Sequence, residues 1–368
     1  MNTIKIGNKI IGDGHKPFIV AEMSGNHNSS LKQALAIVDA AARSGADAIK
    51  IQTYTADTIT MKGAYTISDR NSLWQGTDLH QLYKQAYTPW EWHKKIAERA
   101  KSKGLIWFSS PFDETAVDFL EELNVPVYKI ASFENTHHPL LKRVAATGKP
   151  VIMSTGVASL EDIRESVAIL RGSGCKNLIL LKCTSAYPSL PKHANLKTMA
   201  DMRKKFGCLI GLSDHTLGIG VSVAAAALGA CLIEKHFCLG RNKGGVDAAF
   251  SMEPDEMKTL VTETGNAFFS LGKVSYKLGP SELKSLIFKR SIYASKDIRM
   301  GEKFTKDNIR VVRPNLGLHP RYYQVLLNTK SPTDIKAGTP VKVNVRKNSS
   351  AAKLRAQSHS AKKARQSR

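Results

Sequence analysis

The sequence is poor in the features that mark secreted, zinc-binding and membrane proteins. Its 368 residues include only five cysteines, an odd number, and no Cys-x-x-Cys pair. This usage argues against a disulfide framework or a zinc site, so we expect reduced, mostly buried thiols. The N-terminus lacks a basic segment followed by an apolar run, and no stretch is long and apolar enough to span a bilayer. We therefore expect a cytoplasmic protein with no membrane partner.

Acidic residues are also scarce, with 31 Asp and Glu against 54 Lys and Arg, which gives a net charge of +23. The excess is uneven, because residues 342–368 contain nine Lys or Arg and no acidic residue. This segment has almost nothing apolar to bury, so we expect a disordered basic tail. Basic tails bind polyanions weakly and without sequence choice, so no specific nucleic-acid partner is expected. The rival hypothesis, a nucleic-acid-binding module, predicts binding that falls steeply with salt and is lost with the tail.

What the sequence does contain is a series of eight short apolar runs, each ending in polar or charged residues. The runs are Pro17 to Ser24, Asp47 to Thr53, Leu105 to Ser110, Val127 to Ser132, Pro150 to Thr155, Leu178 to Ser185, Leu209 to His215 and Leu232 to Phe237. Each has the length of a strand, and amphipathic helical stretches separate them. Strands that are apolar on both faces and alternate with helices predict an α/β fold, a closed parallel (β/α)8 TIM barrel. Function is then expected at the carboxyl ends of the strands.

The chain is longer than one barrel requires, so we expect three parts. A barrel domain should cover residues 1–278, with a small N-terminal hairpin that could close its floor. A small domain should cover residues 279–341, where short strand and turn lengths follow the break at residues 277–281. About sixty residues make a marginal domain alone, so this part should dock on its own barrel or on that of another subunit. The basic tail, 342–368, completes the chain.

Two histidines stand at the ends of the last two predicted strands. Because alternate residues of a strand share a face, His215 lies on the same face as Ser213, and His236 on the same face as Glu234. Neighbouring strands could bring both imidazoles to one divalent metal ion, with most positions left for water or substrate. Asp214 and Glu234 are then available to support the two rings. The alternative, two hydrogen-bonded polar residues without a metal, is about equally compatible with the pattern.

Lysines form a second group at the predicted strand ends. Lys50, Lys129, Lys182 and Lys235 lie in or near the ends of alternate strands. A buried ammonium group needs an anionic partner, which is either an acidic side chain or a bound ligand. The hydroxyl groups of several serines accompany Lys50 and Lys129, and cations with small donors suit a phosphate or carboxylate ligand. A structural salt bridge is the other interpretation.

Specific strings at the strand ends decide between these interpretations. They are AEMSGNHN from Ala21, KIQT from Lys50, SSPFD from Ser109, KIASFE from Lys129, STG from Ser154, CTSAYP from Cys183, GLSDHT from Gly211 and IEKHF from Ile233. In this order they closely resemble the sialic acid synthase family, from about residue 3 to 341. Residues 288–320 are similar to the antifreeze-like (SAF) domain that ends the family's chains. The tail departs from the family pattern.

The resemblance implies a condensation of phosphoenolpyruvate with an acetamido sugar, giving a nine-carbon 2-keto acid and phosphate. It implies that His215 and His236 are ligands of a Mn or Mg ion that polarises the sugar aldehyde, and that Glu22 or Glu134 is the acid or base. Positions that match phosphoenolpyruvate contacts are Lys50, Ser110, Lys129, Ser132, Ser154, Ser185 and Ser213. In N-acetylneuraminate enzymes we expect Thr at the position of Ser110 and Asn at that of Ser185. Positions that match the sugar side are Gln52, Tyr187, Asp247 and Phe288.

The resemblance also implies a domain-swapped homodimer, in which Arg313 of the small domain enters the site of the other subunit. The strings around Met23 and Lys129 favour 2,4-diacetamido-2,4,6-trideoxy-altrose as the sugar. Another acetamido sugar, such as those leading to N-acetylneuraminate or legionaminate, is the alternative. A different reaction class is a Schiff-base aldolase with Lys182 or Lys50 as nucleophile. Borohydride would trap its adduct, whereas a metal-dependent condensation would stop with EDTA and return with Mn.

Overall fold

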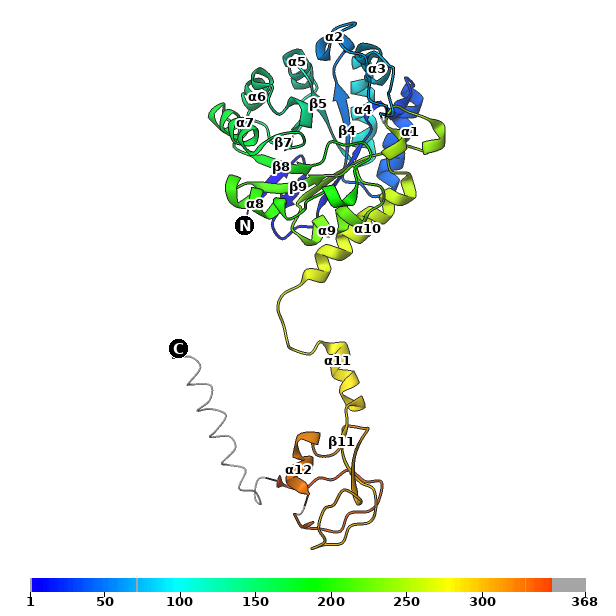
Figure 1. Ribbon diagram of the computed structural model, residues 1–368, viewed down its shortest axis with the longest axis vertical. Coiled ribbons are helices and arrows are strands. Elements are labelled where there is room, and N and C mark those ends of the chain that lie inside the picture. The colour runs from blue at the N-terminus through cyan, green and yellow to red at the C-terminus, as the bar shows by residue number, and fades with distance from the viewer. Residues whose placement is uncertain (1, 71, 328, 346–368) are drawn as a thin grey trace. The chain divides into compact units, whose positions relative to one another are not determined.

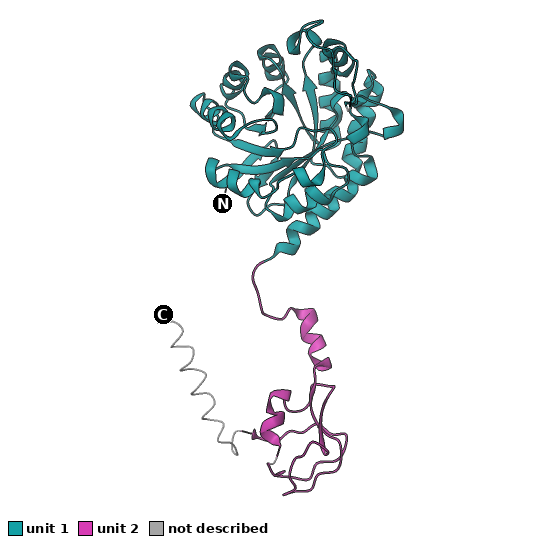
Figure 2. Cartoon of the chain, in the orientation of Figure 1, with its two compact units in different colours: residues 1–272 teal, residues 273–368 magenta. Residues whose placement is uncertain are grey.

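The computed structural model describes residues 2–70, 72–327 and 329–345 and divides the chain into two compact units, residues 1–272 and 273–368 (Figures 1 and 2). We describe each unit by itself. The boundary lies at Gly272, whereas the sequence placed it at residues 278 and 279. Most of the predicted basic tail, residues 346–368, lies outside the described residues.

The first unit is a closed barrel of eight parallel strands, as the sequence predicted. Going round the barrel, the strands follow one another in chain order, and β10 pairs with β3 to close it. The strands are β3 (Phe18–Glu22), β4 (Ala48–Thr53), β5 (Ile106–Pro111), β6 (Tyr128–Ile130), β7 (Val151–Ser154), β8 (Leu178–Cys183), β9 (Leu209–Ser213) and β10 (Leu232–His236). Each ends before or within the polar string that follows its apolar run, so those strings gather at one end of the barrel.

Helices surround the strands (Figure 1). They are α1 (Leu31–Arg43), α2 (Ala56–Ile59), α3 (Leu79–Ala86), α4 (Trp90–Ser102), α5 (Glu114–Glu122), α6 (His138–Ala145), α7 (Leu160–Gly172), α8 (Thr198–Phe206), α9 (Gly220–Ala227) and α10 (Pro254–Leu271). Apart from α2 and α3, their apolar faces pack on the outward residues of the strands in one large core. N-cap residues fix the first turns of several helices. Asp113, for example, accepts hydrogen bonds through its carboxylate from backbone N–H groups in the first turn of α5.

A second apolar cluster fills the inside of the barrel at its amino end. Strands β1 (Thr3–Ile6) and β2 (Lys9–Gly12) form an antiparallel hairpin. Its Ile4, Ile6 and Ile11 pack in one cluster with inward-facing strand residues such as Phe108 and Leu181. The hairpin therefore closes the floor of the barrel, as expected, and leaves the carboxyl end as the open one.

The second unit has a small core of its own. It contains α11 (Pro280–Ser285), β11 (Ser291–Ala294), β12 (Ile309–Val312) and α12 (Tyr323–Leu326), and the two strands pair antiparallel. Ile292, Phe304 and Ile309 are among its fully buried apolar residues.

Two expectations from composition also bear on the structure. All five cysteines are free and buried, as expected. Within the described ranges, no helix combines the length and the apolar character that crossing a bilayer requires.

Candidate active site

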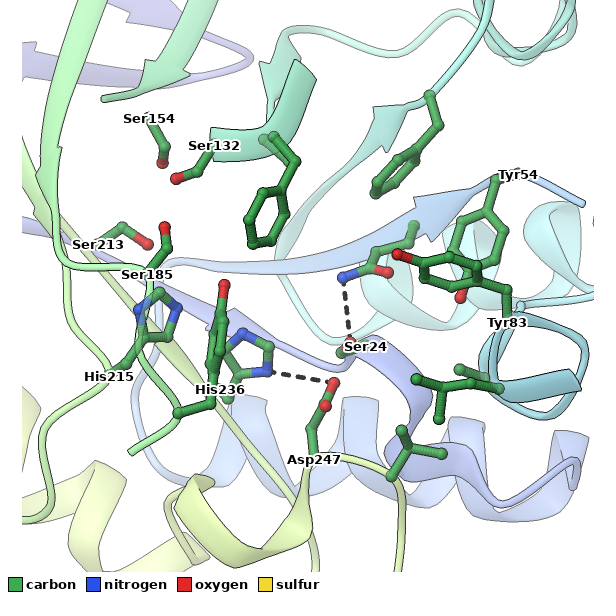
Figure 3. A pocket seen from close by; sticks show the side chains of 18 of the residues that line it. Ser24, Tyr54, Tyr83, Ser132, Ser154, Ser185, Ser213, His215, His236 and Asp247 are labelled. Carbon is green, nitrogen blue, oxygen red and sulfur yellow. Dashed lines mark hydrogen bonds and ion pairs between the residues drawn. The ribbon is translucent and has the colours of Figure 1, made fainter. Parts of the chain in front are cut away.

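A cavity of about 340 Å³ opens at the carboxyl ends of the barrel strands, and most of the predicted site residues converge on it (Figure 3). Eleven of them line it: Lys50, Gln52, Lys129, Ser132, Ser154, Ser185, Tyr187, Ser213, His215, His236 and Asp247. Its volume lies in the range of small-molecule sites. The period-two rule explains the convergence of the residues within strands, such as Lys50, Gln52 and His236, because each strand turns alternate side chains inward.

Lys50 and Lys129 form the cationic centre of the cavity, and both are almost fully buried. The Nζ atom of Lys50 lies 2.7 Å from Oε2 of Glu22 and donates a hydrogen bond to Oγ of Ser110 at 3.2 Å. Burial lowers the pKa of Lys50, but the carboxylates of Glu22 and Glu234 outweigh it and the net shift is upward. Lys50 is therefore a cation held in place, which is the state that binds anions.

Lys129 is held by weaker charges. Its Nζ donates to Oγ of Ser154 at 2.8 Å and to the carbonyl of Ile130 at 2.9 Å. The Oε1 atom of Glu234 lies 3.9 Å from Nζ of Lys129 and 3.8 Å from Nζ of Lys50, so one carboxylate stands between the two ammonium groups. Burial raises the pKa of Glu234, but the positive charges of Lys129 and Lys50 outweigh this effect and the net shift is downward. Glu234 is therefore ionised. Glu234 also lines the cavity, and its shared face with His236 accounts for its position inside the barrel.

Serine hydroxyl groups line one side of the cavity next to these lysines. Ser132, Ser154, Ser185 and Ser213 lie together in Figure 3. Gly156 makes room for them, because a Cβ atom there would lie 2.1 Å from Oγ of Ser185 and 2.7 Å from Oγ of Ser132. Cations beside several small hydroxyl donors form a setting for phosphate or carboxylate oxygens.

The two predicted metal ligands lie side by side at the edge of this group. The ring centroids of His215 and His236 are 5.3 Å apart. Nδ1 of His215 lies 3.1 Å from the carbonyl oxygen of Thr184. Nδ1 of His236 lies 3.6 Å from Oδ2 of Asp247 (Figure 3). Burial lowers the pKa of His236 well below its usual value, so this imidazole is neutral and able to ligate a metal.

These donors fit a divalent ion with few protein ligands. Nδ1 of His236 is buried and has no hydrogen-bond partner within the described ranges, as expected of a ring that awaits a ligand. In the same ranges no three His, Cys, Asp or Glu side chains are grouped to hold an ion. The protein would thus supply the two imidazoles, while substrate and water oxygens completed the coordination.

Two carboxyl groups are candidates for proton transfer. Glu22 accepts a hydrogen bond from Nε2 of Gln52 at 3.0 Å and pairs with Lys50, so its position is fixed. Glu134 ends the short helix η2 (Ser132–Glu134), and its Oε2 is buried without a partner in the described part of the chain. Burial raises the pKa of Glu134 to about 7. A carboxyl group that titrates near neutral pH suits acid or base catalysis.

The structure corrects the role expected for Asp214, and it places Lys182 and Lys235 outside the cavity lining. Asp214 does not support His215. Its Oδ2 instead lies 3.1 Å from Nζ of Lys235 and accepts a hydrogen bond from Ser222 on α9. Residues 214 and 235 are out of phase with the two histidines, so they point away from the cavity. Lys182 also lies outside the cavity lining and donates to the carbonyl of Cys183.

Two predicted site residues lie in the second unit. Phe288 ends the short helix η6 (Leu286–Phe288) and is exposed, and Arg313 directly follows β12. Their roles in a site remain predictions. Other residues that line the cavity were missed, including Tyr54, Trp74, Leu82 and Val246. Those that lie in the βα connections have no strand alternation that could have indicated them.

Comparison with known proteins identifies relatives along nearly the whole chain. The NeuB family model matches residues 37–276, and the SAF domain model matches residues 289–343. The pseudaminic acid synthase of Campylobacter jejuni is 43% identical, over 92% of this chain and 98% of its own. The N,N'-diacetyllegionaminic acid synthase of the same species is 38% identical, over 85% and 95%. The crystal structure of N-acetylneuraminic acid synthetase from Leptospira borgpetersenii, in complex with citrate, has a TM-score of 0.68 and 34% identity, covering 77% of this chain and 95% of that one.

Proposed function

Because the chain belongs to the NeuB family, we propose that it condenses phosphoenolpyruvate with 2,4-diacetamido-2,4,6-trideoxy-altrose to give pseudaminic acid and phosphate. The observation that carries the proposal is the placement of two buried lysines and a group of serines beside a pair of histidines in one cavity. The relatives named as pseudaminic acid synthases support this sugar over the one leading to legionaminic acid, because their identity to the chain is higher.

Phosphoenolpyruvate occupies the cationic side of the cavity. Its phosphate and carboxylate replace acidic side chains as partners of Lys50 and Lys129, and serine hydroxyls donate to the remaining oxygens. The carboxylate of Glu234 lies 3.9 Å from Nζ of Lys129, farther than Glu22 lies from Lys50, so the charge of Lys129 is available to the ligand. The Ser110 hydroxyl accepts a hydrogen bond from Nζ of Lys50 and so keeps the ammonium group in position. The enol ester is thereby fixed with its C3 atom facing the second substrate.

The open-chain sugar lies beside the histidines. A Mn or Mg ion held by His215 and His236 would polarise the aldehyde as a Lewis acid. C3 of phosphoenolpyruvate forms the new bond to the aldehyde carbon, whose oxygen gains a proton. Water adds at C2, and the C–O bond to phosphate then breaks. Glu134 takes the proton from this water, because burial raises its pKa to about 7, which makes it a stronger base than an ordinary carboxylate while part of it stays ionised at neutral pH. Glu22, with Gln52, orients the hydroxyl groups of the sugar.

A phosphate-release assay tests the proposal. The protein, treated with EDTA and then given Mn, is incubated with phosphoenolpyruvate and either the diacetamido-trideoxy-altrose, its legionaminate-type stereoisomer or N-acetylmannosamine. We expect release that requires both the first sugar and the metal, and that is lost in His215→Ala and His236→Ala. Faster phosphate release with one of the other two sugars would make that sugar the substrate instead. Full turnover after treatment with EDTA would show that the reaction needs no metal. A lysine adduct trapped by borohydride would establish aldolase chemistry instead.

Assembly and location belong to the same proposal. The SAF domain brings Arg313 to the sugar of the other subunit in a domain-swapped homodimer, which is consistent with a small second unit that has few apolar residues of its own to bury. A synthase that consumes phosphoenolpyruvate works where that metabolite is made, in the cytoplasm.

A further inference from the structure

The cavity has two chemically different sides. Besides the lysines and serines, the lining includes a group of apolar residues that we call the apolar wall: Ile67, Trp74, Leu79, Leu82 and Val246. The charged groups of phosphoenolpyruvate require the cationic side, so the wall faces the second substrate. None of the roles assigned above uses this wall.

The wall is a built surface rather than a loose loop. Ile67 exchanges backbone hydrogen bonds with the segment just before α3, from its N–H to the carbonyl of Thr77 at 3.0 Å and to its carbonyl from the N–H of Gly76 at 2.8 Å. The indole Nε1 of Trp74 donates to the carbonyl of Val246 at 3.1 Å. This bond ties the connection after β4 to the connection after β10. Leu79 and Leu82 come from the first turn of α3, and Leu82 is buried.

The wall begins next to the reacting centre. The ring centroids of Trp74 and Tyr187 are 6.2 Å apart, and Tyr187 is 4.5 Å from His215. A sugar whose aldehyde lies at the histidines therefore extends its other carbons along the wall. Hydroxyl groups pressed against such a surface would lose water without gaining a hydrogen bond, whereas methyl groups would gain by burial.

We propose that the apolar wall is the specificity determinant of this site, and that it binds the apolar substituents of the sugar: the acetamido methyl groups and the C6 methyl group of the 6-deoxy chain. This inference rests on the proposed function and deepens it. Tyr54 and Tyr83 also line the cavity, with ring centroids 5.6 Å apart, so their hydroxyl groups are available to the amide groups of the substituents (Figure 3). The wall thus selects for the deoxy and acylated carbons and against a fully hydroxylated sugar.

Steady-state kinetics with two sugars test the wall. The first is 2,4-diacetamido-2,4,6-trideoxy-altrose, and the second is 2-acetamido-2-deoxy-altrose, which has hydroxyl groups at C4 and C6. In Ile67→Ser we expect the ratio of kcat/KM for the first sugar over the second to fall about tenfold, the effect of a lost methyl contact in an apolar pocket. The KM for phosphoenolpyruvate should not change. Trp74→Phe keeps the apolar ring but removes the Nε1 bond, and should lower the ratio less.

Met61→Ser is the matched control, because Met61 lies on the same connection and is 78% exposed. It should leave the ratio at the wild-type value. An unchanged ratio in Ile67→Ser, with normal circular dichroism and normal use of phosphoenolpyruvate, would overturn the inference. Failure of the wild-type protein to use the first sugar at all would instead reject the proposed function, so the two failures are distinguishable.

Discussion

Burial raises the pKa of Glu134 to about 7, so this carboxyl group changes charge near neutral pH. If it acts as the base toward water, only the ionised form is active. We expect kcat/KM to be constant above about pH 7 and to fall about tenfold per pH unit below it. We call this fall below pH 7 the acidic limb of the pH profile. Initial rates of phosphate release across pH 5.5–8.5 measure it.

Two variants separate this carboxyl group from other groups that titrate nearby. Glu134→Gln should lose most of its activity and also the acidic limb, whereas Glu134→Asp should keep a limb at a shifted pH. A limb that survives unchanged in Glu134→Gln would assign it to another residue, and Glu22 would then be the first candidate.

At the scale of elements, a buried ion pair ties β9 and β10 to α9. Lys235 donates to Asp214 and to the carbonyls of Thr216 and Gly218, at 2.6 and 2.9 Å for the two carbonyls. Removing one member of a buried pair leaves an uncompensated charge. We expect Lys235→Met to lower the free energy of unfolding by about 3–5 kcal/mol. All four tryptophans lie in the first unit, so urea denaturation followed by tryptophan fluorescence reports on the barrel.

The double variant Lys235→Met with Asp214→Leu should recover part of the loss, since no buried charge is left unpaired. Arg164→Met is the matched surface control. Arg164 and Glu161 form an exposed pair at 3.1 Å, and its loss should cost less than about 1 kcal/mol. Equal effects of Lys235→Met and Arg164→Met would show that the buried pair does not stabilise the strands.

The order and type of the barrel elements could be predicted from sequence because apolar runs of strand length alternate with amphipathic helices. The same alternation placed His215, His236 and Lys50 inside the barrel. It did not yield the hydrogen bond from Ser222 to Asp214, since residues that face outward meet helices whose positions the strand pattern does not fix. Trp74 and Ile67 could not be predicted either, because they lie in a connection whose path depends on its bond to Val246.

At the scale of the whole molecule, the proposed domain swap predicts that two inactive variants complement each other. His236→Ala lacks a metal ligand in the barrel, and Arg313→Ala lacks the contribution of the second unit. When equal amounts are mixed and allowed to exchange subunits, half of the dimers contain one of each. In those dimers one of the two sites is intact, so we expect about a quarter of the wild-type activity.

The complementation experiment includes its own control. Each variant incubated alone under the same exchange conditions should remain inactive, and size-exclusion chromatography should show that both are still dimers. A mixture with no more activity than its parts would mean that Arg313 serves the site of its own chain, or none.

The hairpin at the floor of the barrel has a consequence for the traffic of molecules. The hairpin of β1 and β2 and the apolar side chains packed on it fill the amino end of the barrel, so reactants arrive, and products leave, through the same mouth. Lys50 and Lys129 are almost fully buried inside this mouth, so we expect the enol ester to enter before the sugar. For the same reason we expect phosphate to leave after the nine-carbon acid. A floor closed by apolar side chains would thus give the reaction a fixed order of entry and release.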